Sequence, residues 1–218
     1  MITTTIAPQR AATDRTVRAR WTVPAALGLG VLGGAVLGVV ARLWMRLIST
    51  EPEFTWSGTL FIVVAFALFA FGQAVSWSAR RTSRRRRRVT AARTAGVVLS
   101  LAIFGGAGSL MLPTVLAGAL AAWRTDWTRA VRVVVAIAAV PIAGFLAKEI
   151  VGDLGWGVHG LTGVALFVAL YGVVIVALGP TVAPVADGWR MSRRVRIALT
   201  VAPVGLGALF VTAALLGV

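Results

Sequence analysis

The side chains that could do chemistry are few, and they gather in two short polar stretches of an otherwise apolar chain. One stretch covers residues 42–56, and the other covers residues 148–159 and holds the only lysine and the only histidine. Carboxylates, an amine and an imidazole that meet at one place could transfer protons or hold a polar ligand. We call the following residues the outer polar site: Arg42, Arg46, Glu51, Glu53, Lys148, Glu149, Asp153 and His159.

The same residues also fit plain structural roles. Arg42 and Arg46 lie four apart and share a face if their helix continues, while Glu51 and Glu53 flank a proline in a predicted turn. Ion pairs between these arginines and glutamates are therefore expected. In the second stretch, a lysine and a glutamate at a helix end can snorkel toward water, and His159 is either a proton-sensitive group or a polar anchor.

Several kinds of site are excluded by composition and motif. The chain has no cysteine and one histidine, which rules out disulfides, thiolate catalysis and a histidine-based metal site. It contains no Walker A, HExxH or GxSxG element. We therefore expect no metal, no cofactor and no catalytic residue. An enzyme is the least favoured class, because it would need the acids and the histidine of both polar stretches to converge.

The composition places the chain in lipid. Hydrophobic residues make up 58% and charged residues 13%, and the mean hydropathy is +0.88, which a water-soluble domain of this size could not carry without large exposed apolar patches. The net charge of +15 would suggest nucleic acid in a soluble protein. Here the basic residues lie between apolar segments, so retention on the cytoplasmic side explains them better and no nucleic-acid partner is expected.

Apolar segments of membrane-spanning length predict an all-α polytopic transmembrane helical bundle with six to seven membrane segments. Residues 1–22 form a basic cytoplasmic N-terminal tail, and residues 23–218 form a single transmembrane helical domain in the cytoplasmic membrane. Gln73 is the one strongly polar residue inside the second helix, and we expect it to hydrogen-bond to another helix. Tryptophans at the segment ends predict an interfacial aromatic belt. The predicted helices cover residues 23–44, 57–77, 128–146, 158–178 and 195–218, with a further apolar segment at 95–123.

Eight arginines lie between Arg80 and Arg93, with no acid among them, and they bear on the membrane topology of the segment 95–123. A hairpin that enters and returns puts 19 lysines and arginines on the side of this run and three on the other, against 13 and nine for a single crossing. The positive-inside rule favours the hairpin, either fully crossing or re-entrant. Such a run is usually solvated and disordered, and can bind anionic lipid headgroups.

Small residues recur at every fourth position of the first helix, at Ala26, Gly30, Gly34 and Gly38. They form one face on which another helix can approach closely enough for its backbone to pack. Two uses of this face are open. It can pack against a helix of the same bundle, or it can form an interface with a second copy or another membrane protein.

Residues 42–49 read RLWMRLIS and residues 52–60 read PEFTWSGTL. Here the chain resembles a set of uncharacterised multi-pass membrane proteins from high-GC, actinobacterial-type bacteria that carry a similar stretch. The resemblance covers about residues 41–62, and over the rest of the chain it is one of hydropathy. It implies membership of a multi-pass membrane protein group and no particular activity.

Three functional classes remain after these exclusions. We favour a non-enzymatic bundle that acts through a partner, lipid or self-association, because the chain combines a glycine face with short loops and few buried charges. The alternative is a small-solute or ion transporter, which the glycine break after Phe104 and the prolines within two helices would suit. An intramembrane enzyme comes third.

Overall fold

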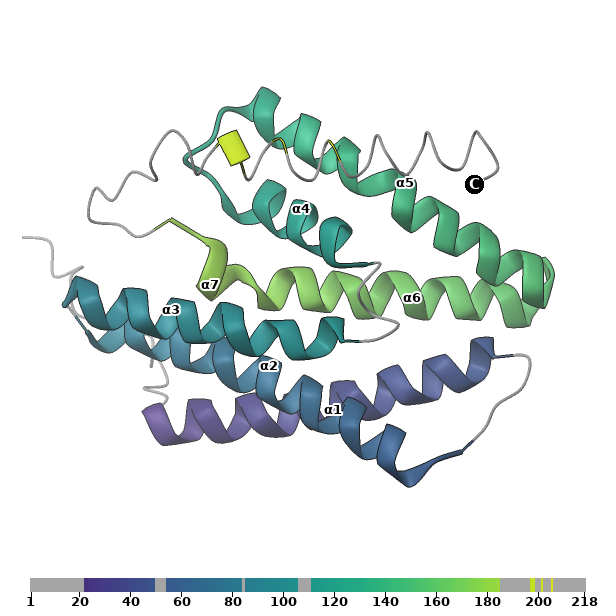
Figure 1. The fold of residues 1–218 in the computed structure, drawn as a ribbon, viewed down its shortest axis with the longest axis horizontal. Coiled ribbons are helices and arrows are strands. Elements are labelled where there is room, and N and C mark those ends of the chain that lie inside the picture. Colours follow the sequence, from purple (N-terminus) through teal and green to yellow (C-terminus); the bar gives the residue numbers. More distant parts are fainter. Residues whose placement is uncertain are drawn as a thin grey trace, which may run out of the picture.

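The computed structural model describes residues 22–49, 54–83, 85–105 and 111–184, together with residues 197, 198, 201 and 205. In these ranges the regular elements are all helices, which confirms the predicted all-α class (Figure 1). The elements are α1 (Val23–Ile48), α2 (Trp56–Thr82), α3 (Arg86–Ser100), the 3₁₀ helix η1 (Leu101–Phe104), α4 (Leu112–Trp123), α5 (Arg129–Leu154), α6 (Val158–Ala177) and α7 (Gly179–Val182).

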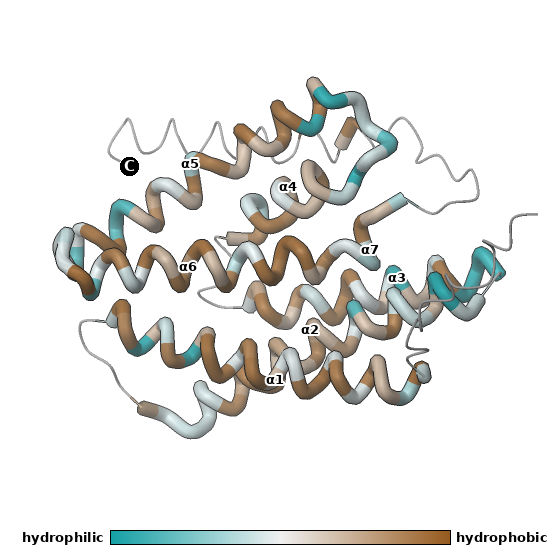
Figure 2. The backbone as a smooth tube through the Cα atoms, turned by 180° about the vertical axis from the view of Figure 1, so that it is seen from behind, coloured by the Kyte–Doolittle hydropathy of each residue, from teal (hydrophilic) through white to brown (hydrophobic). Residues whose placement is uncertain are grey.

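Four helices are long and apolar enough to cross a membrane: α1, α2, α5, and α6 continued by α7. They contain 25 to 27 residues each, or about 38–40 Å at 1.5 Å per residue, against about 30 Å of hydrocarbon. Their middle parts are hydrophobic, and hydrophilic residues gather near the helix ends (Figure 2). These features confirm a membrane protein with transmembrane helices.

Several helices continue beyond their predicted ends. α1 runs to Ile48 instead of Trp44, and α5 passes through Pro141 and continues to Leu154. The hydropathy pattern marks only the part of a helix that lies in hydrocarbon, while leucine, methionine and arginine continue it into the headgroup region. The predicted segment 195–218 and the tail 1–22 lie almost entirely outside the described residues.

The glycine face of α1 packs against α2. A Cβ atom added to Gly30 would lie 2.8 Å from the Ala74 Cβ, and one added to Gly34 would lie 2.7 Å from the Ala70 Cβ. Gly38 is equally close to the backbone of α2. The structure therefore uses this face inside the bundle, and a second copy could reach it only by displacing α2.

The segment 95–123 is divided at its glycines. α3 and η1 form the first arm, which lies along α2, and α4 forms the second arm between α5 and α6 (Figure 1). α4 has 12 residues, about 18 Å, which is too short to cross the hydrocarbon alone. Arg93, just before the segment, and Arg124, just after it, both bond to carbonyls of α7. The two ends of the segment therefore lie together, as the hairpin hypothesis requires.

Trp44 does not belong to an interfacial belt, so that part of the prediction is wrong. Its side chain is 8% exposed, its Nε1 donates to the Gly163 carbonyl at 2.9 Å, and its ring packs 5.9 Å from that of Phe167. Because the indole N–H finds a carbonyl, the ring can be buried without an unpaired donor. By contrast, Trp56 and Trp156 are 80% and 82% exposed at helix ends, where a belt would place them.

Candidate functional site

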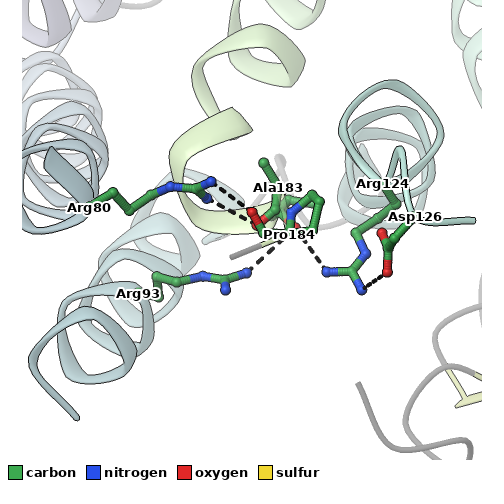
Figure 3. A network of polar contacts seen from close by, with 7 residues as sticks. Arg80, Arg93, Arg124, Asp126, Ala183 and Pro184 are labelled. Atoms are coloured by element: carbon green, nitrogen blue, oxygen red, sulfur yellow. Dashed lines mark hydrogen bonds and ion pairs between the residues drawn. The ribbon is translucent and has the colours of Figure 1, made fainter. Parts of the chain in front are cut away.

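The most polar site in the described part of the chain surrounds the carboxyl end of α7, where the α6–α7 span stops (Figure 3). The last carbonyls of a helix have no partner within the helix. Prolines at Pro180 and Pro184 lack the N–H that could continue a ladder. Three arginines, each from a different part of the chain, donate to these carbonyls instead.

Arg80, on the last turns of α2, makes the most of these bonds. Its Nη1 donates to the Pro180 and Ala183 carbonyls at 3.0 Å each, and its Nη2 donates to the Pro184 carbonyl at 2.8 Å. A guanidinium is suited to this task because it carries five donors in a fixed plane. Its positive charge also lies at the negative end of the α7 dipole.

Arg93 of α3 and Arg124 after α4 complete the cluster. Arg93 Nε donates to the Thr181 carbonyl at 2.7 Å, and Arg124 Nη1 donates to the Val182 carbonyl at 3.4 Å. We call Arg80, Arg93 and Arg124 the arginine clamp, since together they hold one backbone segment. The clamp joins α2, α3 and the α4–α5 connection to the end of α7.

The clamp brings three positive charges close to one carboxylate in the described part of the chain. Arg124 is 2% exposed and pairs with Asp126 at 2.7 Å, the one ion pair in the described part of the chain. Burial first, and then the charges of Arg80 and Arg124, lower the pKa of Arg93 to about 10, so this residue stays protonated at neutral pH. Among the described residues, three guanidinium groups thus lie near one carboxylate and several carbonyl dipoles.

A buried hydrogen-bond network lies next to the clamp, deeper between α2 and α3. Gln73 Nε2 donates to Ser100 Oγ at 2.9 Å, and Thr181 Oγ1 donates to Gln73 Oε1. Ser76 Oγ donates to the Ala92 carbonyl at 3.0 Å. The prediction that Gln73 bonds to another helix is confirmed. These polar groups hydrogen-bond to one another, so the network joins three elements and does not require a ligand.

The remaining arginines of the described run form an exposed corner beside the clamp. Arg81 is exposed and stacks on Trp77, with its guanidinium carbon 4.2 Å from the ring centroid. On the other side of the turn, α3 begins with arginines and has no acid in its first turn. The interpretation of the run as disordered fails for its described residues, which are nearly all helical. The exposed members are Arg81, Arg85, Arg86, Arg87 and Arg88.

The outer polar site lies at the opposite end of the bundle, and its described members do not converge. Arg42 and Arg46 lie on α1 and not in a loop, with Arg42 Nε donating to Thr59 Oγ1 at 3.3 Å and Arg46 lying 5.2 Å from the Phe54 ring. Both glutamates of the expected ion pairs, Glu51 and Glu53, lie outside the described residues.

The second polar stretch is also mostly helical. Lys148, Glu149 and Asp153 lie on the last turns of α5, and His159 lies on the first turn of α6. All four are exposed, and no ion pair joins any two of them in the described structure. Nor does any group of three or more histidine, cysteine, aspartate or glutamate residues in the described ranges lie close enough to hold a metal ion. The geometry shows polar helix ends and no assembled centre.

Sequence reasoning missed the clamp for identifiable reasons. Arg80 and Arg93 belong to a run that looks uniformly solvated, and their partners are backbone atoms about 90 to 100 residues away. A carbonyl acceptor leaves no residue type to recognise. One signal was available: Arg93 stands apart from the block 84–88, among small residues that let α3 approach α2.

Comparisons with protein-family models, with curated proteins and with solved structures give no match to this chain.

Proposed function

We propose that the chain is a multi-pass protein of the cytoplasmic membrane that acts without catalysis, by binding anionic lipid at its arginine-rich end. The observation that carries the proposal is the exposed corner of five arginines, which lies beside the three arginines of the clamp. The corner arginines are exposed and do not fill the core. They suit a surface that holds phosphate groups in place.

The electrostatics of the corner support this role. A helix N-terminus is a region of partial positive charge, and each cation there costs about 0.3–1 kcal/mol in water. α3 begins with three arginines and without an acid in its first turn, so an anion that lies against its start stabilises it. Anionic headgroups supply such anions, at about 1 kcal/mol for each arginine near the surface.

Reconstitution tests this proposal directly. We expect the purified protein to unfold at a higher temperature in phosphatidylglycerol-containing nanodiscs than in pure phosphatidylcholine, and added salt should reduce the difference. The double variant Arg87→Gln/Arg88→Gln should lose most of it. The matched control Arg42→Gln/Arg46→Gln removes the same charge from the other end and should keep it. Equal stability of the native chain in both lipids would refute lipid binding.

The finer topology belongs to this proposal as well. We place the N-terminus, the arginine corner and the α4–α5 connection in the cytoplasm, with the outer polar site outside. Four spans, the two arms of the hairpin and the segment 195–218 then give six or seven membrane segments, depending on how deeply the hairpin enters. The shared position of Arg93 and Arg124 on α7 supports this arrangement.

A transporter is the second candidate, and one observation favours it. A cavity of about 250 Å³ lies between α1, α2, η1 and α6, and apolar side chains line it apart from Trp44 and Tyr171. Since the Trp44 N–H already has a partner, the cavity suits an apolar solute better than an ion. Uptake of such a solute by proteoliposomes that Ala65→Phe abolishes would favour transport over lipid association.

A further inference from the structure

An open groove between three parts of the bundle begins beside the arginine clamp. It measures about 360 Å³ and lies between the first turns of α1, the second half of α2 and the α6–α7 junction. The groove is separate from the space that the packing of α1 against α2 and the contacts of the clamp occupy. The residues that define it are Ala26, Gly30, Ala74, Trp77, Ala177 and Pro180.

The lining of the groove indicates an apolar occupant. Its one amide side chain, Gln73, is 5% exposed and already bonds to Ser100 and Thr181. Apart from Gln73 and Trp77 the lining consists of apolar residues and glycine, from which an alkyl chain would exclude water or a void. Along α2 the groove extends from Ala70 to Trp77, about 10 Å at 1.5 Å per residue. This is too short for packing a whole transmembrane helix.

The charge at the mouth of the groove decides which lipid fits. Trp77 lines the groove, and the exposed Arg81 stacks on its ring at 4.2 Å. Pro180 lines the opposite side, and its carbonyl holds the Arg80 guanidinium at 3.0 Å. An alkyl chain in the groove would therefore bring its headgroup to two cations, Arg80 and Arg81.

From this juxtaposition we propose that the groove is a specific site for one anionic glycerophospholipid. An acyl chain lies between Ala26, Ala74 and Ala177, and the phosphate accepts hydrogen bonds from Arg81 with Arg80 behind it. This inference rests on the proposed function and adds to it a defined site and a stoichiometry of one lipid. It also names two residues, Ala26 and Arg81, that can be altered without changing the arginines at the start of α3.

Native mass spectrometry of protein extracted from vesicles with equal amounts of phosphatidylcholine and phosphatidylglycerol tests the site. The native chain should retain one phosphatidylglycerol under activation that removes other lipids. Ala26→Leu fills the groove and should lose this lipid. Its control, Ala25→Leu, adds the same atoms to the exposed neighbouring residue and should retain it. Equal retention of phosphatidylglycerol by the two variants would overturn the inference. It would mean that the groove holds another part of the chain or nothing.

A second pair of variants tests the headgroup without altering the groove. Arg81→Gln should reduce retention of phosphatidylglycerol about fivefold, which is about 1 kcal/mol. Arg46→Gln, which removes an exposed arginine over the Phe54 ring at the other end of the bundle, should leave it unchanged. Unchanged retention in Arg81→Gln would overturn the assignment of the phosphate to this residue. If phosphatidylglycerol still stabilises the protein in nanodiscs while neither pair of variants differs in lipid retention, only the groove site fails. If the native chain prefers neither lipid in either assay, the proposed function fails with it.

Discussion

Arginines of a single run have two different environments in this protein. Arg80 and Arg93 turn inward and satisfy backbone carbonyls of α7, while Arg81 and the arginines that begin α3 remain exposed. The inward pair supplies donors to helix-end carbonyls that have no partner within their own helix. The exposed set is free of that task, and this division separates the stabilising residues from the proposed lipid-binding ones.

Ion pairing in the clamp gives the first prediction. Asp126→Asn removes the carboxylate from Arg124, whose charge is buried beside two other arginines. We expect a loss of about 2 kcal/mol of stability, between the values for exposed and buried pairs, because Asp126 is itself partly exposed. Unfolding by titration with SDS measures it. Asp153→Asn, an exposed carboxylate at the other end, should have no effect. Equal losses in both variants would contradict the clamp.

Two serines of α2 give a matched test of the buried network. Ser76 Oγ donates to the Ala92 carbonyl, whereas Ser78 Oγ is buried without a partner. Ser76→Ala should lower the free energy of unfolding by about 0.5–1.5 kcal/mol. Ser78→Ala makes the same change where no bond is lost and should be neutral or stabilising. A larger loss at Ser78 would show that the network does not contribute to stability.

At the scale of the elements, much of the fold was predictable because the signals are local. The spans follow from runs of apolar residues, and the break near Phe104 follows from clustered glycines. The amide of Gln73 predicted an interhelical bond since nothing else could satisfy it in lipid. What could not be predicted was the extension of α1 and α5 into their polar ends, or the contact of α7 with three distant arginines, because both depend on tertiary packing.

The close approach of α1 and α2 predicts a strong contrast between neighbouring glycines. Gly34 is buried against Ala70 and Phe66 of α2, while nothing lies within 4 Å of a Cβ added to Gly33. Gly34→Leu should cost about 3 kcal/mol or more, since backbone atoms cannot move aside easily. Gly33→Leu should be tolerated. Thermal unfolding in detergent measures both, and tolerance of Gly34→Leu would mean that α1 and α2 do not pack at this distance.

At the scale of the whole molecule, charge is distributed between two unlike ends. One end holds the clamp, the arginine corner and the mouth of the lipid groove, and the other holds the polar helix ends around Trp44 and Gly163. The sequence predicted this asymmetry from the positions of its basic residues alone. It could not predict that the groove and the clamp adjoin, because their residues come from α1, α2 and the α6–α7 junction.

The orientation of these two ends across the membrane can be measured directly, because the chain has no native cysteine. Ser49→Cys follows α1 at one end, and Ser83→Cys follows α2 at the other, so the two variants make the same small change on opposite sides. In intact cells, a membrane-impermeant maleimide should label Ser49→Cys and should reach Ser83→Cys only after permeabilisation. Labelling of Ser83→Cys in intact cells, with protection of Ser49→Cys, would place the arginine-rich end outside and contradict a cytoplasmic lipid-binding face.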